Sequence, residues 1–86
     1  MLYLEGVKDY VRIHTDDGPV MTLMSMKAME EALPDTRFIR VHRSFIVNLD
    51  RVTTIERNRI VFGKVYIPIT DSYKDRFMEI LSRRLL

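Results

Sequence analysis

Short segments that alternate apolar and polar residues recur along most of the chain, and turn-forming residues separate them. The clearest is 10–15, where Val11 and Ile13 stand between polar neighbours, as in a half-buried β-strand. Similar patterns predict strands at 3–4, 20–23, 38–41, 45–47, 52–55, 60–62 and 65–67, with connections at 5–9, 16–18, 57–59 and 63–64. Strands that follow one another without alternating helices indicate a mainly antiparallel β domain.

Two helices are expected in addition. Ser25 is a suitable N-cap for a short helix that Pro34 ends, and this helix carries Met26, Met29 and Leu33 on one face. Such a stripe is typical of core packing. A terminal helix can be capped by Thr70, Asp71 or Ser72, and its apolar face comprises Tyr73, Phe77, Ile80 and Leu81.

The 86 residues suffice for a single domain, 1–86. The absence of Cys excludes a disulfide framework and fits a cytoplasmic location. No apolar run approaches the roughly 20 residues that cross a bilayer. The opening segment Tyr3-Leu4-Glu5 has strand character from the start, so we expect the chain to be part of a longer protein.

Positive charge is concentrated in one segment. The formal net charge is only +2, but 37–64 contains seven cations and two anions. Arginine also outnumbers lysine ten to four, and the planar guanidinium matches phosphate and guanine edges better than an ammonium does. A polyanionic partner is one interpretation; a solvated basic face with scattered ion pairs is the other.

Few residues are suited to catalysis or metal binding. His42 and Ser44 would share one face of a strand, but no residue is placed to orient the histidine and no oxyanion motif accompanies it. His14 and His42 are the only histidines, and Asp16-Asp17-Gly18 lacks the later ligands of a calcium loop. We therefore expect no enzyme activity, cofactor, metal or small-molecule substrate.

Arg40, His42 and Arg43 bring donors for nucleic acid together in the basic segment. Arg43 is suited to bridge O6 and N7 of guanine, and Ser44 to hold a phosphate. The alternative is that the alternation only places Arg40 and His42 in water.

Residues 38–48, F-I-R-V-H-R-S-F-I-V-N, closely resemble the core motif of the LytTR (LytR/AlgR-type) DNA-binding domains of bacterial response regulators. The resemblance extends over essentially the whole chain. It includes Tyr3-Leu4-Glu5, Tyr10-Val11, the helix that ends at Pro34, and Ile67-Pro68-Ile69.

The resemblance implies an elongated antiparallel β fold of three small sheets with short helices. Family members have one or two more strands before the position of Met1, which would leave an exposed sheet edge. It also implies the output domain of a two-component transcription regulator, joined to a receiver or sensor. Such domains bind imperfect direct repeats of double-stranded DNA as two copies, with loops in successive major grooves.

Three regions would read bases: Arg43, the loop that contains Tyr10, and the position of Asp71, where many members have Arg. Aspartate either accepts from cytosine N4, caps the terminal helix, or leaves recognition to its neighbours. The predicted contacts to the DNA backbone are Lys8, Arg40, His42, Ser44, Ser72 and Lys74. The alternative function is a β-rich module whose basic patch binds RNA or an acidic protein without sequence specificity.

Overall fold

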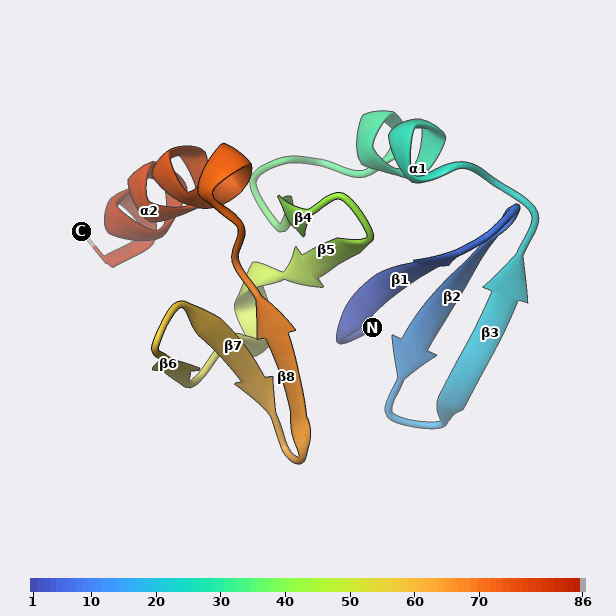
Figure 1. The fold of residues 1–86 in the computed structure, drawn as a ribbon, viewed down its shortest axis with the longest axis horizontal. Coiled ribbons are helices and arrows are strands. Elements are labelled where there is room, and N and C mark those ends of the chain that lie inside the picture. Colours follow the sequence, from blue (N-terminus) through green and yellow to red (C-terminus); the bar gives the residue numbers. More distant parts are fainter. Residues whose placement is uncertain (86) are drawn as a thin grey trace.

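The computed structural model describes residues 1–85, which form eight strands, two α-helices and one 3₁₀ turn (Figure 1). An antiparallel five-stranded sheet has the order β3-β2-β1-β5-β4 and comprises β1 (Tyr3–Val7), β2 (Tyr10–Thr15), β3 (Gly18–Thr22), β4 (Phe38–His42) and β5 (Phe45–Asn48). A second sheet, β6-β7-β8, comprises β6 (Ile55–Glu56), β7 (Arg59–Phe62) and β8 (Val65–Pro68). The remaining elements are α1 (Met26–Ala32), η1 (Leu49–Arg51) and α2 (Asp71–Leu85).

The predicted mainly β, antiparallel fold is confirmed, although residues 1–85 arrange their strands in two sheets, not three. The reason is the pairing of β1 with β5, in which Tyr3 lies opposite Val47. This pairing joins the β1–β2–β3 strands to the β4–β5 hairpin in one sheet. The described chain extends 35 × 26 × 21 Å along its principal axes.

β1 lies in the middle of the five-stranded sheet, with β2 on one side and β5 on the other. β1 therefore has no free edge, and the edges of this sheet are β3 and β4. On β3, Pro19 provides no backbone N–H, which weakens the edge as a template for another strand.

Two connections differ from those predicted. β1 continues to Val7, because Glu5 and Gly6 pair with Arg12 and Val11, and the turn to β2 is only Lys8-Asp9. The strand expected at 52–55 is reduced to β6. Val52 instead closes η1, with its N–H bonded to the Leu49 carbonyl at 3.3 Å.

The alternation of side chains along β1 divides the core between the two faces of the five-stranded sheet. Tyr3 belongs to a cluster with the second sheet and α2, in which Phe77 is fully buried. Leu4 points to the opposite face and packs with Met29 of α1. In Figure 1, α2 lies to the left of β5, the second sheet lies below it, and β1, β2 and β3 lie to the right.

Both helices begin close to the predicted positions. The Ser25 hydroxyl accepts the Ala28 N–H at 3.0 Å and caps α1, and α1 ends before Leu33. α2 begins at Asp71 and buries Phe77, as its apolar periodicity predicts. Within residues 1–85, neither helix has the length and hydropathy needed to cross a membrane.

Candidate nucleic-acid interface

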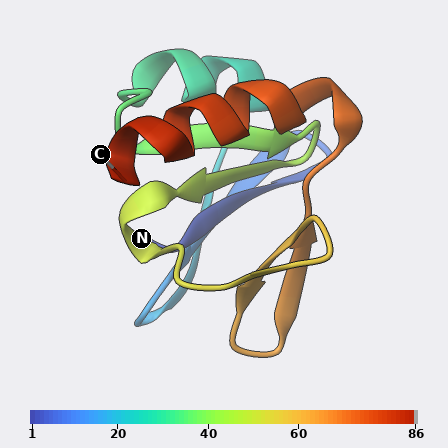
Figure 2. The ribbon, with the colours of Figure 1, turned by 90° about the vertical axis from the view of Figure 1, so that its left-hand side faces the viewer.

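Three segments that the sequence analysis associated with DNA lie side by side along one end of the five-stranded sheet. They are the β1–β2 turn (Lys8-Asp9), the tip of the β4–β5 hairpin (Arg43-Ser44), and the first turn of α2. Since β1 and β5 are antiparallel, the C-terminal end of β1 lies beside the N-terminal end of β5. The β1–β2 turn and the β4–β5 tip are therefore at the same end of the sheet. Figure 2 shows them toward its right-hand side, where α2 also begins.

Direct hydrogen bonds hold these segments together. The Gly6 N–H donates to the Ser44 carbonyl at 2.8 Å, which fixes the β1–β2 hairpin against the β4–β5 tip. The Thr70 N–H donates to the Val41 carbonyl at 3.0 Å, which fixes the start of α2 against β4. The relative positions of the three segments are thus set by backbone contacts.

Gly6 has little free space on the side of α1. A Cβ atom at this position would lie 2.9 Å from Cγ of Met26 and 3.8 Å from Cα of Ser44. Sequence analysis missed Gly6 as a positioning residue. A lone glycine within a strand is nevertheless a known signal of close backbone approach.

At the hairpin tip, His42 pairs with Phe45, so Arg43 and Ser44 form a two-residue loop. Nδ1 of His42 accepts the Ser44 N–H at 3.0 Å, and the ring stands edge-on to Phe45 with centroids 5.4 Å apart. A neutral imidazole that accepts at Nδ1 carries its proton at Nε2. The ring therefore supports the loop with one nitrogen and has a donor left on the other.

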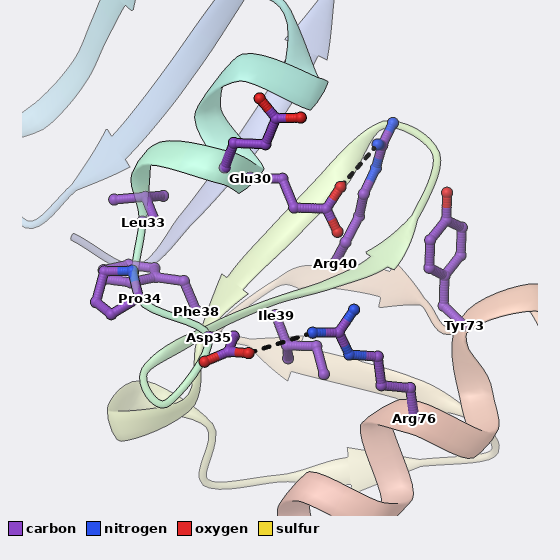
Figure 3. Close-up of a pocket in the computed structure, with 10 residues that line it drawn as sticks. Glu30, Leu33, Pro34, Asp35, Phe38, Ile39, Arg40, Tyr73 and Arg76 are labelled. Carbon is purple, nitrogen blue, oxygen red and sulfur yellow. Dashed lines mark hydrogen bonds and ion pairs between the residues drawn. The ribbon is translucent and has the colours of Figure 1, made fainter.

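Arg40 lies behind the tip and has several contacts of its own. Its guanidinium donates to Glu30 of α1 at 3.3 Å and to the Arg43 carbonyl, and it lies 5.7 Å from the ring centroid of Tyr73. Its side chain is only 17% exposed. Figure 3 shows Arg40 directed toward Glu30, between α1 and Tyr73. A contact of Arg40 with DNA stays a prediction, whereas these contacts make it a brace for the loop that carries Arg43.

The other predicted contact residues are accessible to different degrees. Arg43 and Lys8 are exposed, and Tyr10, at the start of β2, is 46% exposed. Asp71 and Ser72 are exposed in the first turn of α2. Lys74 and Ser44 are half-buried.

The position of Asp71 bears on whether it caps the helix. Thr70 precedes the helix, and its carbonyl accepts the Tyr73 N–H at 3.0 Å. Asp71 is the first helical residue, so its carboxylate is placed to interact favourably with the helix dipole. Thr70 thus occupies the N-cap position, one residue before Asp71, and whether Asp71 contacts a base stays a prediction.

A groove of about 510 Å³ lies between α1, β4 and α2, next to Arg40. Apolar residues, acidic residues and two arginines line it. Figure 3 shows one ion pair of this groove, between Arg76 and Asp35, whose charged atoms lie 3.5 Å apart. In the described part of the chain, no three His, Cys, Asp or Glu side chains are grouped as metal ligands.

Residues 1–82 match a protein-family model described as "LytTr DNA-binding domain". The sensory transduction protein LytT of Bacillus subtilis is 31% identical over 83 residues, which cover 88% of this chain and 34% of the relative. The CO-responsive transcriptional regulator RcoM of Rhodospirillum rubrum is 35% identical over 57 residues, 66% of this chain and 24% of the relative. The chain therefore spans about a third or less of these curated relatives.

A solved structure is also similar. It is the LytTr DNA-binding domain of a putative methyl-accepting/DNA response regulator from Bacillus cereus, with a TM-score of 0.81 and 27% sequence identity. The match covers 93% of this chain and 79% of that one. The likeness therefore extends over most of the fold.

Proposed function

Because the chain belongs to the family of LytTr DNA-binding domains, we propose that it binds double-stranded DNA sequence-specifically as the output domain of a bacterial two-component transcription regulator. It acts as one domain, 1–86, and as a binding module, not an enzyme. The observation that carries this proposal is the convergence of the β1–β2 turn, the β4–β5 tip and the start of α2 at one end of the sheet. Backbone hydrogen bonds join these segments at Gly6–Ser44 and Thr70–Val41.

Arg43 is the principal base-reading residue. It lies at the tip of a two-residue loop that His42 and Arg40 brace from behind. An Arg held in this way reaches into a major groove and bridges O6 and N7 of a guanine. Tyr10 and the start of α2, with Asp71, provide the other base contacts.

Contacts to the DNA backbone come from the residues around these loops. Lys8 stands in the β1–β2 turn, and the free Nε2 of His42 donates to a phosphate. Ser44, Ser72 and Lys74 contribute further donors. These contacts fix the register of the domain and carry no sequence information of their own.

The shape of the domain supports loops in successive major grooves. Its long axis of 35 Å is comparable with the roughly 34 Å rise of one turn of B-DNA. Two copies bound to imperfect direct repeats would then face the same way along the duplex, without the two-fold axis that a palindrome requires. We propose this arrangement, in the cytoplasm, with a receiver or sensor domain in the parent protein.

The test is selection from a pool of random DNA duplexes at near-physiological salt, followed by sequencing of the retained fraction. A repeated motif at helical-turn spacing supports the proposal and supplies the site. Retention without any enriched motif contradicts it and favours the nonspecific module. Competition with an RNA duplex or an acidic protein then identifies the partner of that module.

A further inference from the structure

The β6–β7 turn, Arg57-Asn58, lies next to the start of α2. The Ile69 N–H donates to the Asn58 carbonyl at 2.9 Å, and Ile69 directly precedes Thr70, which bonds to Val41 of β4. The turn is therefore bonded to the residue that directly precedes the candidate interface. It lies toward the same side of the molecule, below those segments on the right of Figure 2.

This turn is basic. Arg57 and Arg59 are both exposed, and Glu56 is the only carboxylate between 53 and 68. Glu56 lies opposite Arg59 in the sheet, yet within residues 1–85 neither arginine is within salt-bridge distance of a carboxylate, unlike Arg12, Arg51 or Arg84. Two guanidinium groups are thus available to an anionic partner.

Tyr66 of β8 supports one of them. The guanidinium carbon of Arg59 lies 4.7 Å from the centroid of the Tyr66 ring. A guanidinium that stacks on an aromatic face keeps its N–H edge available for a bidentate contact with phosphate. The ring itself is 49% exposed, so Tyr66 holds Arg59 at the surface and does not draw it into the core.

The backbone of the turn gives an independent indication. Glu56 pairs with Arg59, and Arg57 and Asn58 form the two-residue loop between them. Their φ values are 49° and 63°. Two left-handed residues of this kind are favourable for Asn and Gly, but not for Arg. Among residues 1–85, the other non-glycine residue with positive φ is Lys8, at 55°, in the β1–β2 turn. Arginine at such a strained backbone position, where Asn or Gly would cost less, points to a functional role for the charge.

We infer that Arg57 and Arg59 form a phosphate-binding surface that extends the DNA interface beyond the three base-reading segments. The partner is the sugar-phosphate backbone of the same duplex, next to the groove that the start of α2 enters. The contact adds affinity for any DNA sequence and no discrimination between bases. The inference rests on the proposed function, because it takes the converging loops to be the DNA-facing side.

The test measures binding of the whole chain to its selected duplex and to a scrambled duplex between 50 and 200 mM salt, as the slope of log affinity against log salt. Each phosphate contact contributes about 0.9 to the magnitude of this slope. We expect Arg57→Ala and Arg59→Ala each to reduce it by about that amount, and to weaken both duplexes by the same factor. Arg83→Ala is the matched control, since it removes the same charge from the far end of α2.

A second set of variants separates charge from folding. Arg57→Asn places a residue that tolerates positive φ in the strained position, so its melting temperature should equal or exceed that of the unmodified chain while its salt slope falls. Tyr66→Phe keeps the aromatic face and should leave the slope unchanged, whereas Tyr66→Ala should reduce it. Arg59→Lys keeps one charge and should restore most of the slope.

The outcomes distinguish this inference from the proposed function. Preference for the selected duplex with an unchanged slope in Arg57→Ala and Arg59→Ala overturns the phosphate surface alone. Reduced slopes without any sequence preference in the unmodified chain overturn the proposed function and leave the phosphate surface standing. Absence of binding by the unmodified chain overturns both.

Discussion

The imidazole of His42 accepts the backbone N–H of Ser44 through Nδ1, at 3.0 Å. This bond spans the two-residue loop that carries Arg43 and holds it in one conformation. Because the side chain of His42 also stands edge-on to Phe45, the tip of the hairpin is anchored to the sheet. The histidine of the motif therefore has a positioning role within the loop, besides its predicted contact with DNA.

Substitution of His42 separates these two roles. In His42→Asn the amide oxygen can replace Nδ1 as acceptor, but the donor at Nε2 is lost. We expect DNA affinity to fall by about 1 kcal/mol, the net value of one hydrogen bond, with the loop intact. His42→Ala should weaken binding further and accelerate hydrogen exchange of the Ser44 amide. Equal exchange rates in both variants would contradict the positioning role.

Arg40 is expected to affect both stability and binding. Arg40→Met keeps the bulk of the side chain but removes its bonds to Glu30 and to the Arg43 carbonyl. Denaturant titration should show a loss of about 1–2 kcal/mol, and DNA affinity should fall. Arg40→Lys should restore little, because one ammonium lacks the fork that reaches both partners.

Arg76→Met is the control for Arg40, because Arg76 lines the same groove. The Arg76–Asp35 pair is exposed, with side chains 58% and 72% accessible. Exposed pairs contribute between about 0 and 1 kcal/mol, so stability and DNA binding should both remain close to those of the unmodified chain. A loss of stability and DNA affinity as large as that of Arg40→Met would contradict the specific role of Arg40, because a change elsewhere in the groove would then have the same effect.

Arg43 should contribute to recognition and not to folding. Because its side chain is exposed, Arg43→Ala should leave the free energy of unfolding within about 0.5 kcal/mol. Discrimination at one base pair should fall by about 1–3 kcal/mol, measured with duplexes substituted at each position. Arg43→Lys should retain general affinity but lose the same discrimination. If Arg43→Ala weakened binding to all duplexes equally, Arg43 would contact a phosphate and not a base.

Gly6→Ala is expected to disturb the interface more than the fold. The added Cβ would lie 2.9 Å from Cγ of Met26, at a cost of about 1 kcal/mol. A shift of β1 that relieves this contact would disturb the neighbouring bond from Gly6 to Ser44. DNA affinity should fall. Gly18→Ala, which strains a turn at φ 109° at the other end of β2, should cost a similar amount of stability, about 1 kcal/mol, without changing DNA affinity.

Acid should weaken the attachment of the end of α2. Hydrogen bonds from Arg84, and then from Arg37, lower the pKa of Asp50 from its ordinary value of 3.8. A carboxyl whose pKa is lower in the folded state stabilises the fold above its unfolded pKa, and this contribution is lost as pH falls through the folded pKa. The melting temperature should therefore drop below about pH 4. Asp50→Asn should lower it at neutral pH and reduce this acid dependence.

The amino-acid sequence by itself determined most of the strands and both helices, and it names the side chains that are expected to contact DNA. The alternation in 10–15 gave β2, the Ser25 cap and the apolar stripe gave α1, and the motif at 38–48 identified the family. These signals are local, because periodicity and capping depend on neighbours within a few residues.

The tertiary structure decided what depends on contacts between distant segments. Pairing of β1 with β5 joined the three strands β1–β2–β3 and the β4–β5 hairpin in one sheet, and it brought Gly6 against Ser44. Thr70 bonds to Val41 across 29 positions, and Arg40 supports a loop through Glu30 of α1. Such contacts depend on register, side-chain packing and chain reversal together. A lone glycine in a strand is a local sign of a close contact, but its partner Ser44 and the contacts of Arg40 are decided only by the folded chain.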